Sequence, residues 1–161
     1  DYMTVQDDYG AIQVSIPSLW DQVDGTPWII DGDVIGASIS AAADLDAFIN
    51  TYSEPGVFFG VSDDLATLGG YVQLLDAYRD VFGPDCTFEG RYDYQDTAYE
   101  GRYDVFSDCA GAGNVMVLLS ARPIQNKTAF LLVVTVNIMY DSDLDALDVI
   151  LDTFDVVGSL P

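Results

Sequence analysis

The side chains of this chain that could do chemistry are mostly carboxylates, because the sequence has no histidine, five Lys and Arg residues, and 27 Asp and Glu residues. A Ser-His-Asp triad, a Cys-His pair and histidine-ligated metal sites are therefore excluded. A Ser-Lys pair would have to use Lys127, which lies in a polar turn next to Asn126. No Gly-rich phosphate loop and no paired Asp-Thr/Ser-Gly motif is present. The sequence therefore predicts a protein that is not an enzyme, with no catalytic residues and no cofactor.

The two cysteines, Cys86 and Cys109, are the next chemically distinctive residues. They form no C-x-x-C motif, which argues against a redox or zinc site. Cysteine pairs are typical of extracellular proteins, where they usually form a disulfide. We therefore expect a Cys86–Cys109 bond in an extracellular or cell-surface protein. In the chain-entropy model such a bond contributes roughly 3–4 kcal/mol.

The pentapeptide Glu-Gly-Arg-Tyr-Asp occurs twice between these cysteines, at residues 89–93 and 100–104. In a hairpin, a single register brings the cysteines together and also forms an aromatic pair and two ion pairs: Tyr92 with Tyr103, Arg91 with Asp104, and Asp93 with Arg102. The same register leaves Thr97-Ala98 as a poor two-residue turn, so we expect a longer loop or a one-residue bulge. We interpret the repeat as cross-strand complementarity. In the alternative, Arg91, Arg102 and Arg122 form the one positive spot on an acidic body.

The net charge of −22 limits the possible partners. Nucleic acid and anionic membrane surfaces are not expected partners, because such a chain repels both. A soluble extracellular protein, a high-salt habitat and calcium binding each account for the acidity. The EF-hand pattern is missing, although Asp31-Gly-Asp33 and Asp141-Ser-Asp143-Leu-Asp145 resemble fragments of acidic loops. A turn at the first and a helix start at the second are the competing interpretations, and calcium stays an alternative.

Aromatic side chains offer a second kind of candidate site, a groove that binds a sugar or a peptide. Packing in the core is the competing interpretation for each of these rings. The rings in question are Trp20, Trp28, Tyr52, Tyr92, Tyr94, Tyr99 and Tyr103.

Hydrophobic patterning predicts the elements that position these residues. Alternating or continuous apolar runs predict strands at 12–16, 34–40, 57–61, 115–121 and 129–138, the last two being central strands covered on both faces. Helical spacing predicts helices that start at Asp44, run over 70–82 and start at Asp141. About three helices covering an antiparallel sheet give an α+β sandwich, and the length fits one domain over residues 1–161. The longest apolar run, 129–134, is too short to cross a bilayer.

Several of these motifs follow one another in a recognisable order: Ile16-Pro-Ser-Leu-Trp20, Pro55-Gly-Val-Phe-Phe-Gly60, Cys86-Thr-Phe-Glu-Gly90 and Asp143-Leu-Asp-Ala-Leu147. The chain resembles the secreted PsbP-like modules of bacterial extracellular proteins, some of which are appended to trypsin-like proteases or receptor kinases. The resemblance implies an αβα sandwich that is not itself an enzyme, and it supplies no functional residues.

Together these observations predict a non-catalytic extracellular binding or accessory module that acts through its surface on a protein partner. The alternative is a self-assembling structural subunit of an extracellular filament or surface layer. In that case, residues 1–9 and 159–161 would pack against a neighbouring copy.

Overall fold

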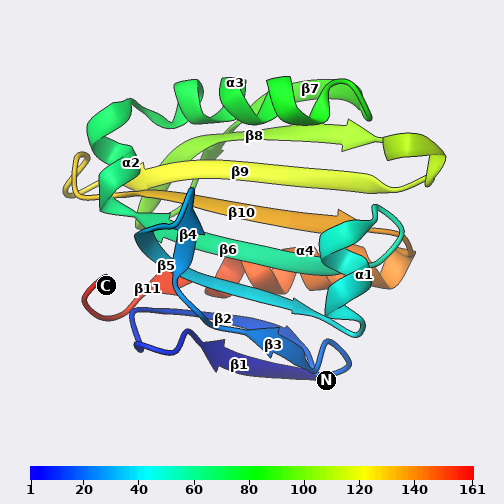
Figure 1. The fold of residues 1–161 in the computed structure, drawn as a ribbon, viewed down its shortest axis with the longest axis horizontal. Helices are drawn as coiled ribbons and strands as arrows, with labels where there is room; N and C mark the ends of the chain where they lie inside the picture. Colours follow the sequence, from blue (N-terminus) through cyan, green and yellow to red (C-terminus); the bar gives the residue numbers. More distant parts are fainter.

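The computed structural model describes residues 1–161, and its centre is an antiparallel sheet of eight strands (Figure 1). Seven of them follow one another across the sheet in the order β3 (Gln22–Asp24), β5 (Asp33–Ala42), β6 (Gly56–Ser62), β10 (Leu131–Ile138), β9 (Val115–Pro123), β8 (Tyr99–Ser107) and β7 (Thr87–Gln95). The eighth strand, β4 (Trp28–Ile30), also pairs with β5. The antiparallel α+β prediction is confirmed.

A second, smaller sheet was not predicted. Its strands are β1 (Tyr2–Gln6), β2 (Ile12–Pro17) and β11 (Asp155–Val156). Both β1 and β11 pair antiparallel with β2, so the two ends of the chain are held by the same strand. Only β2 has the clear alternation of buried and partly exposed residues that a sequence pattern reveals.

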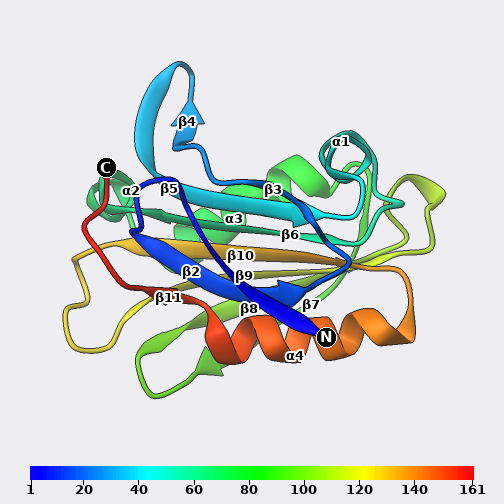
Figure 2. The same ribbon diagram turned by 90° about the horizontal axis from the view of Figure 1, so that it is seen from below.

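Four α-helices are present where about three were expected: α1 (Leu45–Asn50), α2 (Asp63–Leu68), α3 (Tyr71–Phe82) and α4 (Asp141–Thr153). The unexpected helix is α2, which follows β6 directly and is capped by the Ser62 hydroxyl accepting from the Leu65 amide at 3.1 Å. Figure 2 shows α1 and α3 on one face of the large sheet and α4 on the other. None of these helices combines the length and apolar character that crossing a membrane requires.

The main core lies between the large sheet and the layer formed by α4 and the small sheet. Phe59 of β6, Leu119 of β9 and Val134 of β10 contribute to this core, together with Ile150 of α4. The opposite faces of the central strands are covered as well, since Leu118 is also fully buried. The prediction that β9 and β10 are central strands is confirmed, and their continuous apolar runs reflect burial on both faces.

The repeated pentapeptide forms the expected hairpin of β7 and β8. The predicted register holds over most of it, pairing Arg91 with Asp104, Tyr92 with Tyr103, and Asp93 with Arg102. The register shifts between Phe88 and Gly90, where the glycine adopts a φ of 152°. A bulge and a loop longer than two residues are therefore both present, and Cys86 bonds to Cys109 at the base of the hairpin.

The two ion pairs of the repeat lie in different environments. Arg91 donates two hydrogen bonds, of 2.6 and 2.9 Å, to the buried Asp104 and a third, of 2.7 Å, to Asp76 of α3. The pair between Arg102 and Asp93, at 3.3 Å, is exposed. The Arg91–Asp104 pair is therefore largely removed from water, and Arg91 links it to α3 through the exposed carboxylate of Asp76.

Each arginine of the positive spot considered as an alternative has a carboxylate partner. Arg122 and Lys127 both lie against Glu100, at 3.0 and 3.4 Å, so four of the five basic side chains are in ion pairs. The fifth, Arg79, lies over the Phe88 ring at 3.7 Å. Every positive side chain thus has a partner within the protein, and most carboxylates have no basic partner.

Candidate functional site

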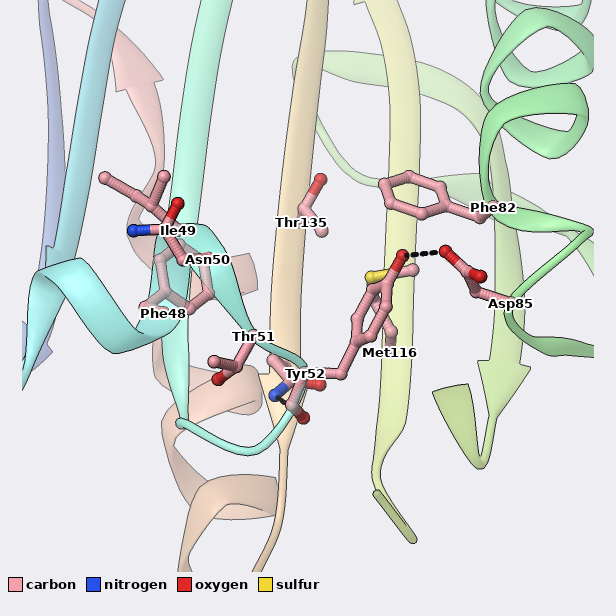
Figure 3. A pocket seen from close by; sticks show the side chains of 10 residues that line it. Phe48, Ile49, Asn50, Thr51, Tyr52, Phe82, Asp85, Met116 and Thr135 are labelled. Carbon is pink, nitrogen blue, oxygen red and sulfur yellow. Dashed lines mark hydrogen bonds between the residues drawn. The ribbon is translucent and has the colours of Figure 1, made fainter. Parts of the chain in front are cut away.

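A pocket of about 420 Å³ opens on the face of the large sheet that carries α1 and α3 (Figure 3). It lies where the sheet is left uncovered between the ends of these two helices. Strands β9 and β10 supply its floor, the end of α1 and the following turn supply one wall, and the end of α3 supplies the other. The lining residues are Phe48, Ile49, Asn50, Thr51, Tyr52, Phe82, Asp85, Met116, Thr135 and Asn137.

The apolar part of the pocket is held in place by aromatic packing. Phe82 stacks on Tyr78 with ring centroids 6.1 Å apart, and it contacts Tyr52 at 6.5 Å and Phe106 at 5.9 Å. Met116 on the floor is buried, and its flexible, polarisable side chain adapts to different apolar shapes. The pocket is therefore suited to one apolar group, held between preformed walls.

The polar part of the pocket is a tyrosine–carboxylate pair. The Tyr52 hydroxyl donates to Oδ2 of Asp85 at 3.1 Å, as drawn in Figure 3. Burial, followed by the bond to Asp85 and the charge of its carboxylate, raises the pKa of Tyr52 above its ordinary value. The second oxygen of Asp85 accepts no bond within the protein, and no basic side chain lines the pocket. This oxygen is free to accept a hydrogen bond from a ligand.

Both walls are tied to the disulfide. Asp85 directly precedes Cys86, and its carbonyl accepts from the amide of Ala110, next to Cys109, at 2.7 Å. On the other side, the Cys109 amide donates to Asn114 at 2.8 Å, and Asn114 donates to Asn137 at 2.7 Å.

This chain of hydrogen bonds ends on the wall that carries Tyr52. The side-chain amide of Asn137 donates to the backbone carbonyls of Tyr52 at 2.8 Å and Glu54 at 3.0 Å. Asn114 and Asn137 are buried, so leaving one of these amides unpaired costs about 1–3 kcal/mol. The disulfide and the two asparagines therefore fix the distance between the two walls.

A second concavity, of about 810 Å³, lies between the tip of the β7–β8 hairpin and the second half of α4. The Tyr94 hydroxyl donates to Asp96 at 2.6 Å, and the Tyr99 hydroxyl donates to Asp155 at 2.7 Å. Burial first, and then these carboxylates, raise the pKa values of both tyrosines far above their ordinary range. We call this concavity the tip groove.

The tip groove is acidic but has little free binding capacity in its floor. Asp96 also accepts from the amides of Ala98 and Tyr99, which closes the hairpin loop. Tyr99 and Phe154 stack on each other with centroids 5.3 Å apart, and both rings are buried. Its remaining carboxylates are exposed on α4, where solvent screens them.

The aromatic residues proposed from sequence do not form one groove. Tyr52 lines the pocket, whereas Tyr94 and Tyr99 line the tip groove. The remaining four pack elsewhere: Trp20 is buried in the main core, Trp28 is buried against Phe58, and Tyr92 packs on Tyr103 with centroids 5.3 Å apart.

The acidic segments considered for calcium have structural roles. Asp31 and Gly32 form the turn between β4 and β5, with φ values of 52° and 83°. Asp143 accepts from the amides of Met139 and Tyr140, both at 2.9 Å, which caps the start of α4. No group of three or more carboxylate, histidine or cysteine side chains converges as a metal site.

Sequence reasoning missed most of the pocket. Phe82 and Met116 were assigned to a helix and a strand without a role in a site, and Asp85 was not singled out. The sequence feature that could have indicated Asp85 is its position next to Cys86, because a disulfide holds the neighbouring backbone in place. Tyr52 alone was a candidate from sequence.

Comparison with solved structures shows what kind of fold this is. The structure is similar to the solution structure of cyanobacterial PsbP (CyanoP) from Synechocystis sp. PCC 6803, with a TM-score of 0.54 and 10% sequence identity. The similarity covers 97% of this chain and 92% of that chain. No family model and no curated protein matches the sequence. The chain therefore has a PsbP-like α+β fold, and at this identity the likeness extends to the fold alone.

Proposed function

We propose that the protein is a non-catalytic extracellular binding module, and that its pocket between α1 and α3 receives one bulky side chain of a protein partner. The observation that carries this proposal is the pocket itself, in which aromatic side chains of both walls and Met116 of the floor lie beside one unused acceptor on Asp85. The disulfide supports an extracellular setting, since such bonds persist in oxidising compartments.

The chemistry of the pocket favours binding over reaction. Its two titratable side chains, Tyr52 and Asp85, are hydrogen-bonded to each other. The raised pKa of Tyr52 keeps its hydroxyl protonated at neutral pH, so this group is a hydrogen-bond donor and not a base. No nucleophile stands beside a base among the lining residues, as covalent catalysis requires.

The size of the pocket sets the scale of its occupant. A volume of about 420 Å³ lies near the lower end for ligand sites and suits a single ring, whereas an extended peptide would need a longer groove. Self-assembly is the less supported alternative. Of the end segments that prompted it, the first pairs with β2 of the same chain through Tyr2–Gln6, and Leu160 of the second packs against the main core. A net charge of −22 also opposes the approach of copies at low salt.

The proposal is tested by titrating the ¹⁵N-labelled protein with N-acetylphenylalanine amide and following the amide resonances. We expect saturable shifts at Thr51, Tyr52, Asp85 and Met116. Thr135→Phe fills the space above the floor and should abolish these shifts, because Thr135 lines the pocket. Thr128→Phe places the same ring in an exposed loop and is the matched control. Shifts that do not saturate, or that persist in Thr135→Phe, would refute the proposal.

A further inference from the structure

Resting on this proposed function, we infer that the occupant of the pocket is cationic as well as aromatic: the N-terminal residue of a partner chain, with an aromatic side chain on the floor and its α-ammonium group on Asp85. The α-ammonium of an N-terminal phenylalanine or tyrosine lies a few bonds from the ring. One residue therefore provides the two features that the pocket accommodates side by side.

The carboxylate of Asp85 is the first reason for a cation. One of its oxygens is occupied by Tyr52, and the other accepts nothing. No basic side chain neutralises it, because all five basic residues are engaged elsewhere, four in ion pairs and Arg79 on Phe88. An ammonium donor would make a charge-assisted bond to the free oxygen, which is stronger than a bond from a neutral donor.

The surrounding charge is the second reason. A net charge of −22 gives a negative potential that repels an anionic occupant and attracts a cationic one. The basic side chains that could offset it locally are absent from the pocket lining. Asp85 is exposed, so water solvates its carboxylate when the ligand is neutral, whereas an anionic ligand is repelled and a cationic one gains a direct partner.

The aromatic walls are the third reason, and they favour an arylalkyl ammonium over a plain alkyl ammonium such as a lysine side chain. Phe48, Tyr52 and Phe82 line the pocket, with Met116 on its floor. Ring edges and faces at these positions contact an aromatic occupant well and also stabilise a nearby ammonium group through cation–π attraction. Figure 3 shows Asp85 close to Tyr52, Phe82 and Met116, so the carboxylate lies next to the aromatic side chains.

The test compares probes that differ in one feature, by calorimetry or NMR titration of the intact protein at about pH 6, where an α-ammonium group is protonated. Phenylalanine amide carries the cation and the ring. N-acetylphenylalanine amide lacks only the cation, alanine amide lacks only the ring, and N-acetyllysine amide carries its ammonium on an alkyl chain. We expect phenylalanine amide to bind about tenfold or more tighter than each of the others.

Two variants separate the role of Asp85 from general charge. Asp85→Asn keeps an acceptor for Tyr52 but removes the charge, so it should reduce the affinity for phenylalanine amide to that for the acetylated probe. Asp80→Asn makes the same charge change at an exposed position of α3 outside the pocket and should leave both affinities unchanged.

The outcomes distinguish this inference from the proposed function. Equal affinity for the two phenylalanine probes, or an unchanged preference in Asp85→Asn, would overturn the cationic occupant and leave the pocket as a site for a neutral ring. Tighter binding of N-acetyllysine amide would overturn the N-terminal aromatic residue in favour of a lysine side chain. Failure of all four probes to perturb the pocket would refute the inference and the proposed function together.

Discussion

The two ends of the β7–β8 hairpin use the same chemistry for different purposes. At the disulfide end, the Tyr52–Asp85 bond joins segments far apart in the sequence and leaves one carboxylate oxygen free beside an open pocket. At the tip, Tyr94 binds Asp96 and Tyr99 binds Asp155, while buried rings fill the floor. The two ends therefore differ in what they leave unused: acceptor capacity and open space remain beside Tyr52 and Asp85, and neither remains in the floor of the tip groove.

The largest effect is expected from breaking the ion pair that lies between the two ends. Asp104→Ala removes the buried partner of Arg91 and should lower the free energy of unfolding by about 3–5 kcal/mol, because Arg91 is left with Asp76 alone. Asp93→Ala removes the exposed partner of Arg102 and should change it by at most about 1 kcal/mol. Urea denaturation measures both, and equal losses would show that the two pairs are energetically alike.

Removing the disulfide should affect the two ends unequally. The Cys86→Ser/Cys109→Ser double variant is expected to lose roughly 3–4 kcal/mol of stability in the chain-entropy model, with native structure otherwise retained. Because Asp85 and Asn114 depend on this bond for their positions, the amide resonances of the pocket should broaden or shift, whereas those of Asp96 and Asp155 should not. Equal disturbance at the tip would contradict the local role of the disulfide.

A smaller effect is expected at the tip. Tyr99→Phe removes a buried hydroxyl that donates to Asp155, which should cost about 1 kcal/mol. The variant should leave binding of phenylalanine amide in the pocket unchanged, because Tyr99 does not line it. A weakened affinity in this variant, measured by the same titration, would mean that the two ends are coupled.

The pH dependence should also reflect the tip. Burial and carboxylate neighbours raise the pKa values of Tyr94 and Tyr99 in the folded state. Above about pH 10, the unfolded chain therefore loses phenolic protons that the folded chain keeps, and stability falls as pH rises. Denaturation at increasing alkaline pH should show this decline, with a shallower slope in Tyr99→Phe than in Tyr9→Phe, a variant at an exposed position. Identical slopes would contradict the assignment.

The hairpin could be predicted from sequence because its information is local. Two copies of one pentapeptide between two cysteines admit one register that satisfies the covalent bond and both ion pairs, and the structure confirms it. The central strands β9 and β10 could also be predicted from sequence, since burial on both faces leaves a continuous apolar run. The small sheet could not be predicted, because β1 is mostly exposed and β11 has only two residues.

The pocket could not be predicted in the same way, because its residues come from elements that only the tertiary fold brings together. Phe48 and Tyr52 follow one strand, Asp85 follows a distant helix, and Met116 lies on a central strand. Each residue has an ordinary structural interpretation when taken alone. They line one pocket only because a gap remains between α1 and α3, which no local pattern encodes.

The most direct test of the central claim is a single NMR titration of the wild-type protein with phenylalanine amide, read at both ends of the hairpin. The account predicts saturable shifts at Thr51, Tyr52, Asp85 and Met116, with the amides of Asp96 and Asp152 unmoved. Saturable shifts at the amides of the tip groove, without shifts at the amides of the pocket, would contradict the claim.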